Sequence, residues 1–297
     1  MSSYTSLLLH RAHDVLFVTL NCPATRNALS PEVTAELTQV SRDAQADTAL
    51  RAIVLRGSQG FFCAGGNIGS FQSRLDAHTQ SEATAHASLE HDPIAARNRE
   101  FGRFLEMWSA LPVPIIAVVE GAAMGGGMGL ACTADIVLAT EDAKFALTET
   151  ALGIIPAQIA PFVQARIGQR NAIRLGLFGE RVSGQQAVAL GLVDELAVDS
   201  QALDERLTHW LSRMSRCAPG ANQALKRLFT QTRNSEGLTQ QLDDAALSFS
   251  ACMRNEGPEG IAAFREKRAA RWLVTFDVTQ VRQAHAGDTP TLPTSRS

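Results

Sequence analysis

The stretch IIAVVEGAAMGGGMG at residues 115–129 decides the fold. Its first five residues are continuously apolar, which is typical of a strand buried on both faces of a sheet. A glycine run leads into the segment 125–132, which we expect to be a helix with unpaired backbone N–H groups at its start. The apolar run 136–139 is expected to be the next strand. This order of elements indicates an α/β fold with a largely parallel sheet.

The same alternation occurs nearer the N-terminus. Residues 15–20 (VLFVTL) predict a strand, and Ser30 followed by a proline predicts the start of a helix. Four apolar residues at helical spacing form one stripe on that helix: Val33, Leu37, Val40 and Ala44. The segment 52–55 (AIVL) predicts the next buried strand, and 94–108 predicts a second amphipathic helix.

After about residue 183 the pattern becomes helical. Helices are expected over 185–190, 201–214, 220–232, 238–253 and 258–272, with no strand longer than 192–196. We therefore expect an α/β body at 1–182, a helical region at 183–274 and a disordered tail at 275–297. The polar, aperiodic stretch 72–93 indicates a long surface excursion of the kind that often forms a lid.

Composition excludes several classes of protein. The chain has 297 residues, 45% hydrophobic and 19% charged, which indicates a globular protein with a sizeable core. Its formal charge of -3 argues against nucleic-acid and membrane partners, and no apolar run reaches the roughly 20 residues of a membrane helix. Five scattered cysteines without a CxxC pair predict neither disulfides nor a zinc site, so we expect a cytoplasmic protein without a metal.

Two glycine-rich segments follow buried strands, at 57–68 (GSQGFFCAGGNI) and at 121–129 (GAAMGGGMG). Neither contains GxGxxG or GxxxxGK[ST], which excludes the dinucleotide and P-loop motifs. Each segment alone is explained by a tight turn or by close helix packing. Two such segments facing one point would instead present a pair of backbone N–H donors, which is what an enolate or a tetrahedral oxyanion requires.

Glu149 is an isolated carboxylate in the otherwise apolar stretch 145–156. Burial would raise its pKa and make it a proton carrier near neutral pH, whereas the alternative is a solvated surface residue. The chain contains no GxSxG, and no histidine stands beside a nucleophile in such a motif. A serine triad is therefore not indicated.

Together these segments resemble the crotonase superfamily, the enoyl-CoA hydratases and isomerases. The resemblance runs from about residue 15 to 272 and is carried by RNALS at 26–30, FCAGGNI at 62–68, LPVPIIA at 111–117, EGAAMGGG at 120–127, ADI at 134–136, the stretch 145–156 and FREKR at 264–268. It implies a ββα superhelix, or spiral, with a C-terminal all-helical trimerisation region in a homotrimer or hexamer. It implies an acyl-CoA substrate and no separate cofactor.

The resemblance also implies roles for particular residues. The N–H groups of Gly66 and Gly126 would form the oxyanion hole, and Glu149 would be the catalytic acid and base. Further substrate-binding residues are expected at Arg26, Ala28, Ala64, Gly65, Asn67, Ile68, Gly125 and Gly129. Lys267 is expected to reach the CoA phosphates of the same or a neighbouring subunit.

Gly129 departs from the family pattern, because familiar hydratases carry a second glutamate there. The single Glu149 leaves hydration, double-bond isomerisation and non-catalytic acyl-CoA binding as alternatives. The loop 153–163 is more similar to hydratases of methylglutaconyl-CoA and isohexenylglutaconyl-CoA, which favours hydration. The second carboxylate of such a substrate would need a cation or a donor, and the candidates are Arg97, Arg99, Arg103 and Gln158, with a solvated helix face as the alternative.

Overall fold

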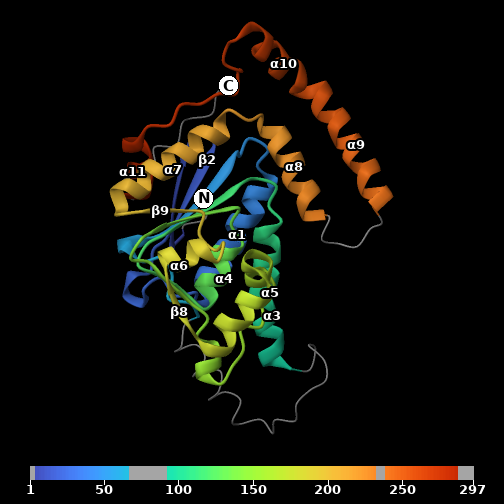
Figure 1. The fold of residues 1–297 in the computed structure, drawn as a ribbon. Coiled ribbons are helices and arrows are strands. Elements are labelled where there is room, and N and C mark those ends of the chain that lie inside the picture. The colour runs from blue at the N-terminus through green and yellow to red at the C-terminus, as the bar shows by residue number, and fades with distance from the viewer. Residues whose placement is uncertain (1–3, 67–91, 232–237, 287–297) are drawn as a thin grey trace.

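A computed structural model describes residues 4–66, 92–231 and 238–286, and Figure 1 shows their arrangement. Within these ranges the main sheet has six strands in the order β1-β2-β3-β4-β6-β9. Their bounds are β1 Leu7–Ala12, β2 Val15–Leu20, β3 Ala52–Gly57, β4 Ile115–Val119, β6 Ile136–Thr140 and β9 Glu195–Ala197. Only β1 pairs antiparallel, with β2, and the other neighbouring pairs are parallel. The α/β prediction is confirmed.

A second, smaller sheet carries the chain onward from the main one. It consists of β5 (Ala122–Met124), β7 (Lys144–Ala146) and β8 (Arg181–Ser183), in that order. Short turns connect β4 to β5 and β6 to β7. The second sheet therefore lies directly beyond the carboxyl ends of two central strands, where the second glycine-rich segment also falls.

The two helices predicted in the first half of the chain are present. In α1 (Pro31–Ala46) the Ser30 hydroxyl accepts a hydrogen bond from the Val33 N–H at 3.2 Å, which confirms the predicted cap. The predicted apolar stripe of α1 is buried at all of its positions: Val33, Leu37, Val40 and Ala44. The second helix, α3 (Pro93–Ser109), begins after Asp92, whose carboxylate accepts from the N–H groups of Ile94 and Ala95.

Successive residues of β3 enter two different cores, as the alternation of side chains along a strand requires. Ile53 and Leu55 contribute to the core that includes Trp108 of α3. Val54 contributes to the opposite core, with Leu207 of α7 (Ser200–Ser215). The central strands are thus covered on both faces, as their continuous apolar runs predicted.

The helices expected after residue 183 are also present, as α6 (Gly184–Ala189), α7, α8 (Pro219–Gln231), α9 (Leu238–Asn255) and α10 (Gly257–Glu266). The last of them was expected to reach residue 272 but ends at Glu266, because Lys267 adopts a left-handed conformation. Figure 1 shows α9 and α10 projecting away from the body. The strand β9 lies in this region yet joins the main sheet beside β6, so the region is partly built into the body. In the described ranges no helix combines the length and hydropathy needed to cross a membrane. The expected trimer contact stays a prediction.

The prediction of a disordered tail from residue 275 is wrong for residues 275–286. They include α11 (Val278–Ala286), which contacts β1, β2 and α7. Phe276, Val281 and Ala284 are buried in the core beneath α11. The segment is polar on average, so its sequence did not indicate this small apolar face. The face stabilises a helix only because β1, β2 and α7 are there to pack against it. Residues 287–297 lie outside the described ranges.

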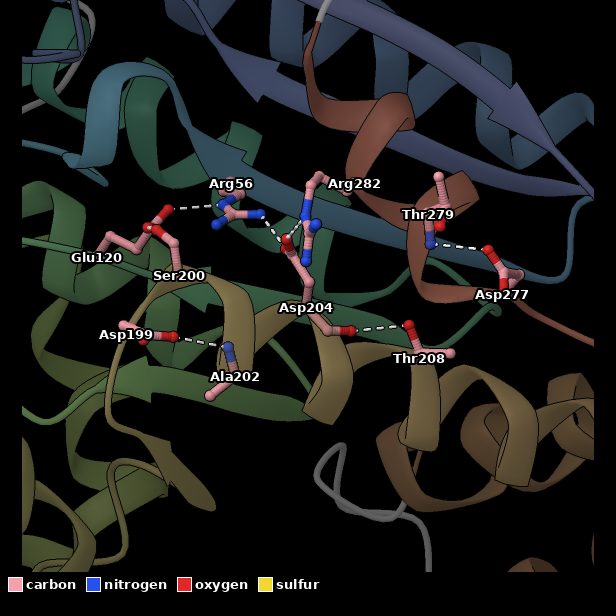
Figure 2. Close-up of polar contacts among 10 residues, drawn as sticks. All are labelled: Arg56, Glu120, Asp199, Ser200, Ala202, Asp204, Thr208, Asp277, Thr279 and Arg282. Atoms are coloured by element: carbon pink, nitrogen blue, oxygen red, sulfur yellow. Dashed lines mark hydrogen bonds and ion pairs between the residues drawn. The ribbon is translucent and has the colours of Figure 1, made fainter.

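A buried ion network joins the sheet to α7 and α11 (Figure 2). Arg56 of β3 donates from Nε to Glu120 and from Nη1 to Asp204 of α7, each at 2.6 Å. The Ser200 hydroxyl donates to Glu120, and Arg282 of α11 contacts Asp204 at 3.1 Å. The network therefore fastens elements that are far apart in the sequence.

Candidate active site

The first glycine-rich segment is held between β5 and the loop at residues 26–29. Cys63 makes a parallel bridge with Ala123, through hydrogen bonds from Cys63 N–H to the Ala122 carbonyl and from Met124 N–H to the Cys63 carbonyl, both 3.0 Å. On the other side the Leu29 N–H donates to the Gly65 carbonyl at 2.8 Å. These backbone bonds position Gly66 at the end of the segment.

The second glycine-rich segment passes from β5 into α4 (Gly126–Cys132) through Gly125. The φ of Gly125 is +48° with ψ at -118°, a conformation that glycine adopts readily and other residues rarely do. Gly126 is the first residue of α4, so its N–H has no carbonyl partner within the helix.

The structure brings Gly66 and Gly126 side by side. A Cβ atom placed on Gly126 would lie 3.7 Å from the Gly66 nitrogen, and one placed on Gly65 would lie 3.5 Å from the Gly126 nitrogen. Neither the Gly66 nor the Gly126 N–H donates a hydrogen bond to a group in the described ranges. Two uncommitted amides held side by side can donate to one oxygen atom together.

Glu149 lies against the turn at Gly125. It begins the short 3-10 helix η3 (Glu149–Leu152), and its Oε1 is 2.7 Å from the position that a Cβ atom on Gly125 would take. Its Oε2 is buried and has no hydrogen-bond partner among the described residues. Burial raises the pKa of Glu149 above its ordinary value, because desolvation disfavours the charged carboxylate. The site thus contains one carboxyl group that can exchange a proton.

Gly129 of α4 is covered by Ile159, the residue before α5 (Ala160–Phe178). A Cβ atom on Gly129 would lie 2.2 Å from Ile159 Cγ2 and 2.4 Å from its Cβ, and Ile159 is buried. Ile159 therefore fills the space in which a second carboxylate would begin. Gly129 is a structural requirement of this packing, which the sequence alone did not indicate.

The other expected substrate-binding residues are placed as follows. Ala64 is joined to the exposed Arg26 by a backbone hydrogen bond of 3.0 Å, and Ala28 is buried nearby in the same loop. Arg26 stacks over the ring of Phe61, with its guanidinium carbon 5.6 Å from the ring centroid. Asn67, Ile68 and nearly all of the predicted excursion at 72–93 lie outside the described ranges.

Asn27 is a supporting residue whose role the sequence analysis missed. Its buried side chain donates to the Phe61 carbonyl at 2.6 Å and accepts from the Cys22 N–H at 2.9 Å. It thereby ties its own loop to the segment that leads to Gly66. The signal was the polar Asn27 directly before the small and apolar Ala28 and Leu29 of the motif RNALS, where a buried amide needs partners.

Lys267 ends α10 in a left-handed conformation. In Figure 1 α10 stands at the far end of the projecting C-terminal helices, well apart from α4. The structure therefore does not bring Lys267 to the glycine segments of its own chain, and its expected contact with a neighbouring subunit's CoA stays a prediction.

The four candidates for recognising a substrate carboxylate separate into two groups. Arg97 and Arg103 are exposed on α3. Arg99 and Gln158 are partly buried and come together beside Gly102. In the described part of the chain no three His, Cys, Asp or Glu side chains are grouped as metal ligands.

The chain belongs to the enoyl-CoA hydratase/isomerase family, whose model matches residues 10–274. Its mixed α/β fold is that of crotonase-type enzymes. Among solved structures, an enoyl-CoA hydratase/isomerase from Marinobacter aquaeolei is 40% identical with a TM-score of 0.82, over 91% of this chain and 99% of that one. AtuE from Pseudomonas aeruginosa is 43% identical with a TM-score of 0.82, over 91% of this chain and all of that one.

Among curated relatives, the 2,3-dehydroadipyl-CoA hydratase of Escherichia coli (strain K12) is 32% identical to this chain over 268 residues. The match covers 89% of this chain and 97% of that protein. Family membership thus places the chain among acyl-CoA enzymes and supports hydratase activity at the level of the family.

Proposed function

We propose that this protein adds water across the 2,3 double bond of an enoyl-CoA thioester, with Glu149 as its only acid and base. The observation that carries the proposal is the convergence of the uncommitted N–H groups of Gly66 and Gly126 beside a partly buried carboxyl group with an unpartnered oxygen. Donors already in place at the thioester oxygen stabilise the enolate as it forms, without reorganisation during the reaction.

The reaction proceeds through an enolate. The Glu149 carboxylate takes a proton from water while the water oxygen bonds to C3, and the C2–C3 π electrons move toward the thioester carbonyl. Gly66 and Gly126 donate to the resulting enolate oxygen. The protonated Glu149 then delivers its proton to C2, which restores the carbonyl and the carboxylate. The raised pKa of Glu149 suits this exchange, because the group must both accept and release a proton.

Glu149→Gln tests this role. We expect kcat for water addition to fall by at least about 100-fold, because general acid–base catalysis contributes about that much. The matched control is Glu141→Gln, which changes an exposed glutamate earlier in the chain. Unchanged hydration by Glu149→Gln would contradict the proposal.

A second candidate activity is double-bond isomerisation, which needs one carboxyl group to move a proton between C2 and C4. The apolar contact between Ile159 and Gly129 favours it, because Ile159 fills the space from which a second carboxylate on α4 would hold a water molecule. Mass spectrometry of the product separates the activities: hydration adds the mass of one water and isomerisation adds none. Binding of several unsaturated acyl-CoA esters without turnover would instead indicate a non-catalytic acyl-CoA protein.

We further propose that the substrate's acyl group carries a second carboxylate, as a branched glutaconyl group does. The resemblance of the loop 153–163 to glutaconyl-CoA hydratases supports this choice. The name of the Escherichia coli relative, a 2,3-dehydroadipyl-CoA hydratase, also describes an acyl group with two carboxyl ends. The same mass measurement with crotonyl-CoA, 3-methylglutaconyl-CoA and longer branched esters would identify the accepted class.

A further inference from the structure

Two elements cover the helix that begins at Gly126. Phe101 of α3 lies over the start of α4, with its Cζ atom 3.7 Å from the position of a Cβ on Gly126. Ile159, just before α5, lies over Gly129 one turn further along α4. These two apolar side chains flank the first turn of α4 beside the proposed oxyanion hole, so an acyl chain that ran along α4 from that hole would pass them.

The residues next to Phe101 and Ile159 in sequence, Gly102 and Gln158, are in direct contact. A Cβ atom on Gly102 would lie 1.9 Å from Gln158 Oε1 and 2.7 Å from Arg99 Nη1. Gln158 Nε2 donates to Asn98 Oδ1 at 2.8 Å. We call Asn98, Arg99 and Gln158 the Gly102 cluster, because only a residue without a side chain at position 102 leaves room for them.

The Gly102 cluster has more donors than its own contacts use. Among the described residues, no acceptor is bonded to the Asn98 amide nitrogen or to Arg99 Nη1. Arg99 Nη2 is paired with Glu106 at 2.7 Å, but the Glu106 side chain is 61% exposed and its charge is largely screened by solvent. All three members of the cluster are partly buried. A partly desolvated group of donors with one cation suits a carboxylate.

We propose that the Gly102 cluster determines substrate specificity by binding a carboxylate at the far end of the acyl chain. This inference rests on the proposed enoyl-CoA chemistry and names the side chains that select its substrate. Phe101 and Ile159 provide an apolar wall for the middle of the chain, and the cluster follows with donors. A site built to bind a charged group rejects an analogue that lacks it, because its donors then stay unpaired.

The test compares two substrates of equal chain length, 2,3-dehydroadipyl-CoA and hex-2-enoyl-CoA, in the full-length protein. Gln158→Met keeps the length of the side chain and removes its amide. We expect kcat/KM for the dicarboxylic substrate to fall about 10- to 100-fold, mainly through KM, because hydrogen bonds to charged groups have that strength. The value for hex-2-enoyl-CoA should change less than about threefold. Asn98→Leu should act in the same direction.

The matched control is Gln169→Met, which makes the same substitution at an exposed position of α5 and should leave both substrates unaffected. Equal losses on both substrates in Gln158→Met would overturn the proposal, as would a wild-type preference for hex-2-enoyl-CoA. Water addition to hex-2-enoyl-CoA by the wild type tests the proposed function separately.

If neither substrate turns over, calorimetry with the saturated esters adipyl-CoA and hexanoyl-CoA still decides the specificity. Adipyl-CoA should bind the wild type at least about 10-fold more tightly than hexanoyl-CoA, and Gln158→Met should remove that difference. Equal affinities in the wild type would overturn the assignment of the Gly102 cluster.

Discussion

The site around Gly126 and the ion network around Arg56 both lie near the carboxyl ends of β3 and β4, yet they are built in opposite ways. Around Gly126 the contacts are made by backbone groups, which approach closely because the glycines have no side chains. Around Arg56 they are made by charged side chains, with Arg56 8%, Glu120 6% and Asp204 3% exposed. The two regions are joined where the Phe62 N–H donates to the Glu120 carbonyl at 2.9 Å.

The difference lies in which groups remain uncommitted. In the network, the buried charges of Arg56, Glu120 and Asp204 are each matched by an opposite charge within hydrogen-bond distance. At the glycine segments, the amides of Gly66 and Gly126 and one carboxyl oxygen of Glu149 have no partner among the described residues. We therefore expect the glycine segments to carry the function and the ion network to contribute to stability.

Asp204→Ala should give the largest loss of stability. It leaves the buried guanidinium of Arg56 with only Glu120, and removing one partner of a buried ion pair reduces the unfolding free energy by about 3–5 kcal/mol. Urea denaturation measures this loss, with Glu205→Ala on the exposed side of α7 as the control. A loss below about 1 kcal/mol would show that the network contributes little.

Gly129→Ala should have the next largest effect, of about 1–3 kcal/mol on the unfolding free energy, because the new methyl group would overlap Ile159. The double substitution Gly129→Ala with Ile159→Ala should lose less stability than the two single losses added together, since removing the isoleucine makes room. Denaturation of all four proteins measures the coupling. Strict additivity would contradict the contact.

The smallest effect on the unfolding free energy near neutral pH is expected from substitution of His285 of α11. Its ring packs against Phe17 at a centroid distance of 5.1 Å, and both ring nitrogens are buried without a partner among the described residues. Burial lowers the pKa of His285 to about 3, and the nearby Arg56 and His10 add to this shift. In the unfolded chain the pKa is about 6.5.

The direction of the pH effect follows from these values. Since the unfolded chain takes up the proton first, the stabilisation from the neutral, buried His285 is present above about pH 6.5 and is lost as the pH falls toward 3. We expect His285→Leu to flatten the decline of unfolding free energy over this range. His209→Leu, on the exposed side of α7, should not. Identical pH slopes for wild type and His285→Leu would contradict this account.

Elements with strong local patterns were predictable. The strands β2, β3 and β4 are dense in β-branched and aliphatic residues, and α1 carries both a cap and an apolar stripe. The strand β1 was missed because its sequence LLLHRA does not alternate, and it is stabilised by pairing with β2 across a turn in which His13 and Asp14 have positive φ. The three-residue strands β5, β7 and β8 are too short for any periodicity to appear.

The residues of the candidate site could be identified from the sequence, because glycine runs after strands and a lone carboxylate in an apolar stretch are unusual patterns. The residues that contact them could not be predicted. Ile159 contacts Gly129 and Gln158 contacts Gly102, and nothing in the sequence of either segment indicates that it packs against the other. Apolar patterns report how much of a side chain is buried, but not which segment buries it.

The amino-acid sequence by itself determined the α/β class, the central strands, the helices with strong periodicity and the glycines that free particular amides, because these depend on steric and hydrophobic preferences of nearby residues. Only the tertiary structure decided that Gly66, Gly126 and Glu149 meet, that α11 docks on the sheet, and that the space beside Gly129 belongs to Ile159. Such contacts join residues far apart along the chain, and they depend on how every intervening element packs.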